Sequence, residues 1–198
     1  MGCEPFPDPV APRHGFLPPL CRIHRLDPAA GLDWPAVPPA PLLTDPFGEE
    51  LPALPVCLAL AYDDRSLYVR AAWPAGEGRL DPSLPPDHDR FWRQDHVELR
   101  FAPDPARRHR QVQFLFVADG RFFDSLGLWR SGSDVRVQPL TADAEGRCGL
   151  LAEVPFEAAG LGPPHAGQLL CGLAGQVRWN EHGGPGIADY RPTRAADW

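Results

Sequence analysis

The most informative part of the sequence is FWRQDHVELRF, residues 91–101. Apolar and polar residues alternate along it with a period of two, which predicts a β-strand with one face toward a core and one polar face. The polar face carries His96, Glu98 and Arg100, and Trp92 stands just before the strand. A flat ring beside a row of polar groups at a sheet surface is typical of a sugar-binding site.

The same alternation recurs along the chain, while no long segment has a helical period. Turn signals separate the alternating segments at roughly 8 to 12 residue spacing, which is typical of sandwiches. We therefore predict an all-β fold, an antiparallel β-sandwich of jelly-roll or immunoglobulin-like type. Its strands are expected within residues 56–62, 67–73, 97–101, 112–118, 135–140, 150–156 and 169–180. Its core is expected to contain Leu58, Leu60, Val69, Val97, Leu99, Phe114, Phe116 and Val177.

The beginning of the chain differs from the rest in composition. Proline pairs at 18–19 and 38–39 favour extended and turn conformations there. The chain has 198 residues, which is enough for one sandwich domain with an extension. We assign residues 1–25 to a proline-rich N-terminal lead-in and residues 26–198 to the sandwich domain.

Charge excludes two classes of partner. The net charge of −7 and the pI near 5.4 argue against binding to nucleic acid or to an anionic membrane, which needs a dense positive face. No secretory signal or membrane-spanning run is visible; the sequence leaves the location unknown, with cytoplasmic as the default. The sequence does not indicate an oligomeric state.

Cysteine and metal patterns are weak. The five cysteines are odd in number and form no CxxC pair, so we expect buried free thiols and neither a disulfide framework nor a zinc site. Residues 81–95 supply carboxylates and carbonyls that could ligate a structural calcium ion, which prefers oxygen donors. No other cofactor is expected.

The last predicted strand supplies further polar groups. Its apolar residues share one face, and its polar residues share the other. If this strand joined the same sheet as Glu98, the two polar rows would form one shallow surface. Carboxylates, amides and guanidinium groups suit sugar hydroxyls, and an indole suits the flat face of a pyranose. The predicted ligand-binding residues are Trp92, Glu98, Gln176, Arg178, Asn180 and Trp198.

The pattern W-x-x-D-x-V-E-L beginning at Trp92, supported by the AEVP run at 152–155, resembles the family 9 carbohydrate-binding modules and related DOMON-like sandwiches. The resemblance implies a jelly-roll-like domain that holds saccharides between two tryptophans, often with structural calcium and commonly in exported proteins. By position it implies that Trp92 is a stacking ring, that Glu98 is a sugar ligand and that Asn180 is a polar contact. Leu115 departs from the basic residue that the family can place on the next strand.

We therefore predict non-catalytic binding of a neutral saccharide, with no enzymatic activity. Two alternatives stay open: a small sandwich enzyme or sensor acting on sugars, for which Glu98 and Glu153 could form a carboxylate pair, and a structural or adaptor domain without a ligand. A haem-binding sandwich is disfavoured because the only Met is the initiator, which removes a Met/His axial pair.

Overall fold

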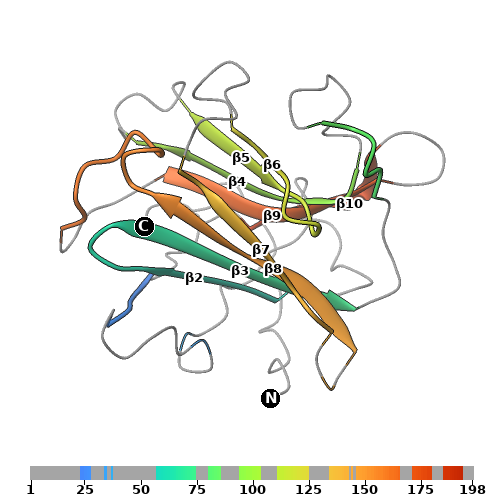
Figure 1. Cartoon of the computed structure of the whole chain (residues 1–198). Coiled ribbons are helices and arrows are strands. Elements are labelled where there is room, and N and C mark those ends of the chain that lie inside the picture. The colour runs from blue at the N-terminus through green and yellow to red at the C-terminus, as the bar shows by residue number, and fades with distance from the viewer. Residues whose placement is uncertain are drawn as a thin grey trace, which may run out of the picture.

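A computed structural model describes residues 23–27, 34, 37, 57–74, 80–85, 94–103, 111–124, 134–142, 144 and 146–165, and describes the strands at 171–179 and 185–193 by their backbone alone. These residues form ten β-strands and no helix. The strands make two five-stranded sheets that pack face to face, as Figure 1 shows. No helix long and apolar enough to cross a membrane occurs in the described residues.

The first sheet is antiparallel except at one edge. Its strands, in spatial order, are β1 (His24–Arg25), β2 (Cys57–Tyr62), β3 (Ser66–Pro74), β8 (Arg147–Pro155) and β7 (Arg136–Leu140). The exception is β1, which runs parallel to β2. Since β1 consists of His24 and Arg25, the sheet extends two residues into the segment that we predicted as a lead-in.

The second sheet is antiparallel throughout. Its strands, in spatial order, are β10 (Pro185–Thr193), β9 (Cys171–Trp179), β4 (His96–Ala102), β5 (Val112–Phe116) and β6 (Phe122–Asp124). Strand β4, which contains the HVELRF part of the stretch quoted above, lies at the centre of this sheet. The predicted all-β sandwich is therefore confirmed.

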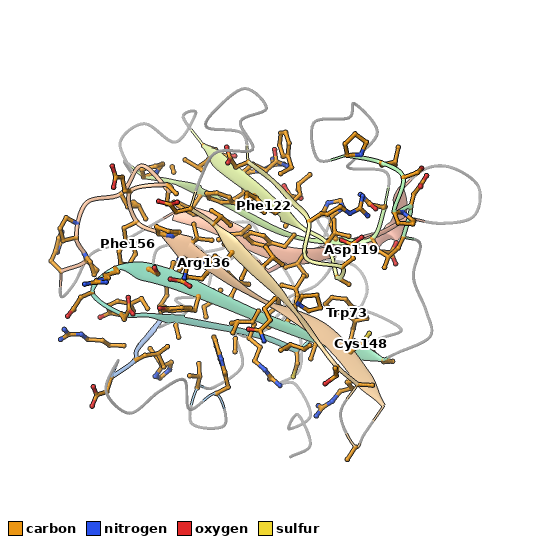
Figure 2. All side chains as sticks on the ribbon, in the orientation of Figure 1. Trp73, Asp119, Phe122, Arg136, Cys148 and Phe156 are labelled. Carbon is orange, nitrogen blue, oxygen red and sulfur yellow. The ribbon has the colours of Figure 1, made fainter. Side chains whose placement is uncertain are left out.

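The core lies between the two sheets. Seven of the eight residues predicted for it, all except Val177, are at most 2% exposed and belong to one cluster. Three phenylalanine rings stack in its centre: Phe114 lies 6.3 Å from Phe101 and 5.9 Å from Phe116, between ring centroids. Phe156 belongs to the same cluster and Phe122 packs against it; both are labelled in Figure 2. Burial of this aromatic surface is a main stabilising contribution to the sandwich.

A second, smaller cluster covers the outer face of the first sheet. Leu26 and Val37 from the N-terminal part pack against Ala59 and Ala61 of β2, with Trp34 and Tyr68 beside them. The backbone amide of Leu26 also donates to the carbonyl of Tyr62, at 2.7 Å. These contacts join the described N-terminal residues to the sandwich.

Cys57 corrects an expectation from sequence. It is disulfide-bonded, whereas Cys148 is a free thiol. The prediction of free thiols is therefore wrong for Cys57. Spacing along a chain does not show which cysteines approach each other across strands, so the sequence could not indicate this bond.

The aromatic stack gives the first testable prediction. Phe114→Ala removes a fully buried ring from the middle of the stack, so the free energy of unfolding should fall by about 3–5 kcal/mol. Leu80 is 44% exposed, and Leu80→Ala should change the free energy of unfolding by less than about 0.5 kcal/mol. Urea denaturation measures both values, and a loss below about 1 kcal/mol for Phe114→Ala would contradict the described core.

Candidate functional site

Three polar side chains on the outer face of the second sheet are joined by short hydrogen bonds. Glu98 Oε1 accepts a bond of 2.5 Å from Arg100 Nη2 and a bond of 2.8 Å from Gln113 Nε2. The alternation of β4 places Glu98 and Arg100 opposite to the core residues, and the register of β5 brings Gln113 directly beside Arg100. We call Glu98, Arg100 and Gln113 the polar trio.

The carboxylate of Glu98 is covered although it lies on the outer face. Glu98 is 3% exposed, while the side chain of Arg100 is 35% exposed and forms the more accessible part of the ion pair. An ionised carboxylate removed from water must be compensated by opposite charge and hydrogen bonds, and the trio supplies both. The predicted face of Glu98 is therefore confirmed, but the carboxylate is less open to solvent than a surface strand position would be.

Apolar residues continue the same face beside the polar trio. Leu115 and Val117 are 4% and 0% exposed, and Phe123 of β6 packs against them. Leu115 pairs directly with Glu98, and Phe123 pairs with Leu115. The face therefore combines a neutralised carboxylate with buried apolar side chains, of which Phe123 is only partly buried and can offer an apolar contact.

His96 extends this face toward the beginning of β4. Its ring is buried, and Nδ1 lies 2.7 Å from the carbonyl oxygen of Gln94. A carbonyl only accepts, so Nδ1 carries the proton. Burial lowers the pKa of His96, and this effect outweighs the opposing influence of the Gln94 carbonyl and of the Glu98 and Asp95 charges. The imidazole is therefore neutral near pH 7.

Strands β4 and β9 are direct neighbours, but their register contradicts part of the prediction. Val97, a core residue, pairs with Gln176, and His96 pairs with Val177. Residues directly opposite in an antiparallel pair share a face, so Gln176, and Arg178 by alternation, occupy positions on the core face. Val177 occupies a position on the face of Glu98. The prediction that Val177 lies in the core and that Gln176 and Arg178 share the face of Glu98 is wrong.

The prediction failed because it did not take into account how much space the side chains of the neighbouring strand fill between the sheets. On the core face of β9, Gly172 and Ala174 are paired with Phe101 and Leu99, whose large side chains fill the space between the sheets. The apolar residues of β9 were assigned to the core by their hydrophobicity alone. Because the outer face of this sheet also carries buried apolar residues, hydrophobicity does not distinguish its two faces.

The other predicted site residues lie outside the described part. Trp92, Asn180 and Trp198 are not described, so their roles as stacking rings and polar contact stay predictions. Arg100 and Gln113 were missed as site residues. Arg100 could have been found from its spacing of two from Glu98, whereas Gln113 required the register of β4 with β5.

The two glutamates considered as a catalytic pair are not brought together. Glu153 of β8 lies between the core residues Ala152 and Val154, so it faces outward from the first sheet, where Ser66 Oγ donates to it at 3.2 Å. Glu98 faces outward from the second sheet. The core of the sandwich separates the two carboxylates.

The described residues contain no group of three or more His, Cys, Asp or Glu that could hold a metal ion. Within the loop expected to bind calcium, Asp81 Oδ1 accepts bonds of 3.0 and 2.5 Å from the amide and hydroxyl of Ser83, which closes a turn. Calcium takes six to eight oxygen ligands, and residues 80–85 and 94–103 do not assemble such a set. Residues 86–93 of that loop are outside the described part, so calcium stays a prediction.

Comparison with known proteins identifies the fold. No protein-family model matches the chain, and no curated protein matches its sequence. Two solved structures of a family 9 carbohydrate-binding module from Caldicellulosiruptor kristjanssonii are similar, each at 13% identity. The complex with cellotriose gives a TM-score of 0.50 over 75% of each chain. The complex with glucose gives 0.48 over 70% of this chain and 66% of the other, just under two thirds. The chain therefore has a fold like that of the family 9 carbohydrate-binding modules.

The neutral His96 gives a prediction for the dependence of stability on pH. Its pKa is lowered in the folded state, so the unfolded chain binds the proton more strongly. The contribution of the neutral His96 to stability should therefore be fully present above about pH 6.5, the ordinary pKa of histidine. This contribution should be lost progressively as the pH falls through the lower pKa of the folded state. His96→Asn should show a smaller loss between pH 7.5 and pH 5.5 in urea denaturation. The same loss in both proteins would contradict the assignment.

Proposed function

We propose that this domain binds a neutral saccharide on the outer face of β4 and β5 and does not transform it. The polar trio is the observation that carries the proposal. The guanidinium of Arg100 and the amide of Gln113 are partly exposed and can donate to sugar hydroxyls, while the covered Glu98 carboxylate holds both donors. Glu98 and Arg100 neutralise each other, so the trio has no net charge with which to select a charged ligand.

Trp92 is the proposed stacking ring. It precedes β4 in the chain, and an indole offers a flat face against which the C–H groups of a pyranose pack. Phe123, which is partly exposed and packs against Leu115 and Val117, would extend the apolar part of this surface. Asn180 and Trp198 remain predicted contacts, and the proposal does not depend on them.

The fold likeness indicates which sugars to test first. The module from C. kristjanssonii is described in complex with glucose and with cellotriose, both of which are neutral. The likeness extends to the fold alone at 13% identity, so the ligand of this chain is part of the proposal. Stacking and a few hydroxyl bonds, offset by desolvation and ordering, usually leave a micromolar to millimolar Kd, or about 4 to 8 kcal/mol.

Binding without cleavage is supported by the separation of Glu98 from Glu153. Most glycoside hydrolases place two carboxyl groups on either side of one bond, about 5 to 9.5 Å apart. Glu98 and Glu153 lie on opposite outer faces of the sandwich, so they cannot act on one glycosidic bond. Release of reducing sugar from cello-oligosaccharides by the wild-type protein would favour the enzyme alternative instead.

Trp92→Ala tests the ring. Removal of the indole should reduce the affinity for cellotriose to near the limit of detection, because stacking supplies much of the binding free energy. Calorimetric titration of wild type and variant measures this. A urea midpoint close to that of the wild type would show that the fold is retained, and equal affinity in both proteins would eliminate Trp92 as the stacking ring.

Glu98→Gln tests the polar trio, with Glu153→Gln as a matched control on the opposite outer face. The substituted glutamine lacks the negative charge that Arg100 neutralises, so its bonds to Arg100 and Gln113 should be weaker. Affinity for cellotriose should therefore fall by roughly tenfold or more. Glu153→Gln should leave the affinity unchanged. If the control weakened binding as much as Glu98→Gln did, the ligand would not lie on the face that carries the trio.

A further inference from the structure

One arginine joins three loops at the end of the second sheet where β4 begins. Arg121 Nε and Nη2 donate to Asp119 Oδ2, at 2.8 and 2.5 Å. Its Nη1 donates to the carbonyl of Leu84, and its Nη2 donates to Gln94 Oε1 at 3.2 Å. The guanidinium therefore links the β5–β6 hairpin, the loop at 80–85 and the segment that enters β4.

The hairpin holds Arg121 firmly. The amide of Val117 donates to the carbonyl of Arg121 at 2.9 Å, and Gly120 supplies the positive φ, 95°, that the tight turn requires. Asp119, labelled in Figure 2, lies in the same turn. Partial burial would raise the pKa of Asp119, but the hydrogen bonds and charge of Arg121 outweigh this and lower it. The ion pair is therefore intact at neutral pH.

Gln94 is the acceptor on the other side of this link. It is completely buried, and its Oε1 also lies 3.4 Å from the amide of Asp81. Its Nε2 is buried and has no hydrogen-bond partner in the described part of the chain. A buried donor without a partner is unfavourable, and an apolar side chain of similar size would avoid this cost. Such a side chain would not accept from Arg121, so the amide is the group that makes the connection.

The main chain of Gln94 is fixed as well. Its carbonyl accepts from the buried Nδ1 of His96, so both the side chain and the backbone of Gln94 are held. Trp92 lies two residues earlier in the chain, a separation that spans at most about 7 Å between Cα atoms. The covalent chain therefore ties Trp92 closely to the fixed residue Gln94.

We propose that Arg121 is a positioning residue for the saccharide site, acting through Gln94 to hold the segment that carries Trp92. This inference rests on the proposed function, in which Trp92 is the stacking ring. A ring that is already positioned loses less conformational freedom when the sugar binds, so the link to Arg121 increases affinity without touching the ligand.

Arg121→Met tests the inference, because it keeps a long apolar stem and removes every donor. Arg136→Met is the matched control: that guanidinium is 79% exposed on the other sheet and lies 3.8 Å from Glu153. Hydrogen exchange of the ligand-free proteins should show faster exchange at residues 91–95 in Arg121→Met alone, with the amides of residues 97–101 unchanged. Calorimetry should show cellotriose binding weakened by about tenfold in Arg121→Met and unchanged in Arg136→Met.

Gln94→Met removes the same link from the acceptor side and replaces Arg121→Met if that variant does not fold. Equal exchange at residues 91–95 in wild type and variant, or unchanged affinity, would overturn the inference. Faster exchange in all strands would assign Arg121 a merely structural role and would also overturn it. Failure of the wild-type protein to bind any neutral saccharide would instead reject the proposed function, and the exchange comparison would still decide whether Arg121 positions the segment.

Discussion

The arrangement of the second sheet depends on the hydrogen bonds of the buried Glu98 carboxylate. It lies on the central strand β4, whose other face supplies Val97 and Leu99 to the core. Because the side-chain period of a strand is two, any slip of β4 by one residue would carry both Glu98 and Arg100 between the sheets and would separate Glu98 from Gln113. The bond from the amide of Gln113 therefore stabilises one register of β4 and β5, and Glu98, Arg100 and Gln113 form the candidate site.

The outer faces of the two sheets differ in how they are used. On the first sheet, residues of the N-terminal part pack on β2, and Tyr68 hydrogen-bonds to Asp63 at 2.9 Å. On the second sheet, the polar trio lies beside Leu115 and Val117. A face with a neutral polar centre and an apolar flank suits a sugar better than a nucleotide or an anionic lipid, which would require uncompensated positive charge.

Much of the fold could be predicted from sequence, because β2, β3, β4 and β5 alternate strongly and their inward residues are large. The edge strands β1 and β10 could not be. β1 has only two residues, and β10 begins with Pro185 and contains Pro192, which weaken a strand signal. Of the site, Glu98 was predicted from its phase on β4. Gln113 depends on strand register, and the face of β9 depends on how Phe101 and Leu99 fill the core, neither of which a single strand pattern contains.

The most direct test of the account is a map of backbone amide chemical shifts by NMR as cellotriose is added to the protein. The largest changes should lie on residues 94–100 and 111–117, around the polar trio. Residues 66–72 and 147–153, on the opposite sheet, should change little. Changes concentrated on the opposite sheet would contradict the location of the site, and the absence of changes with any neutral saccharide would contradict the proposal that the domain binds sugar.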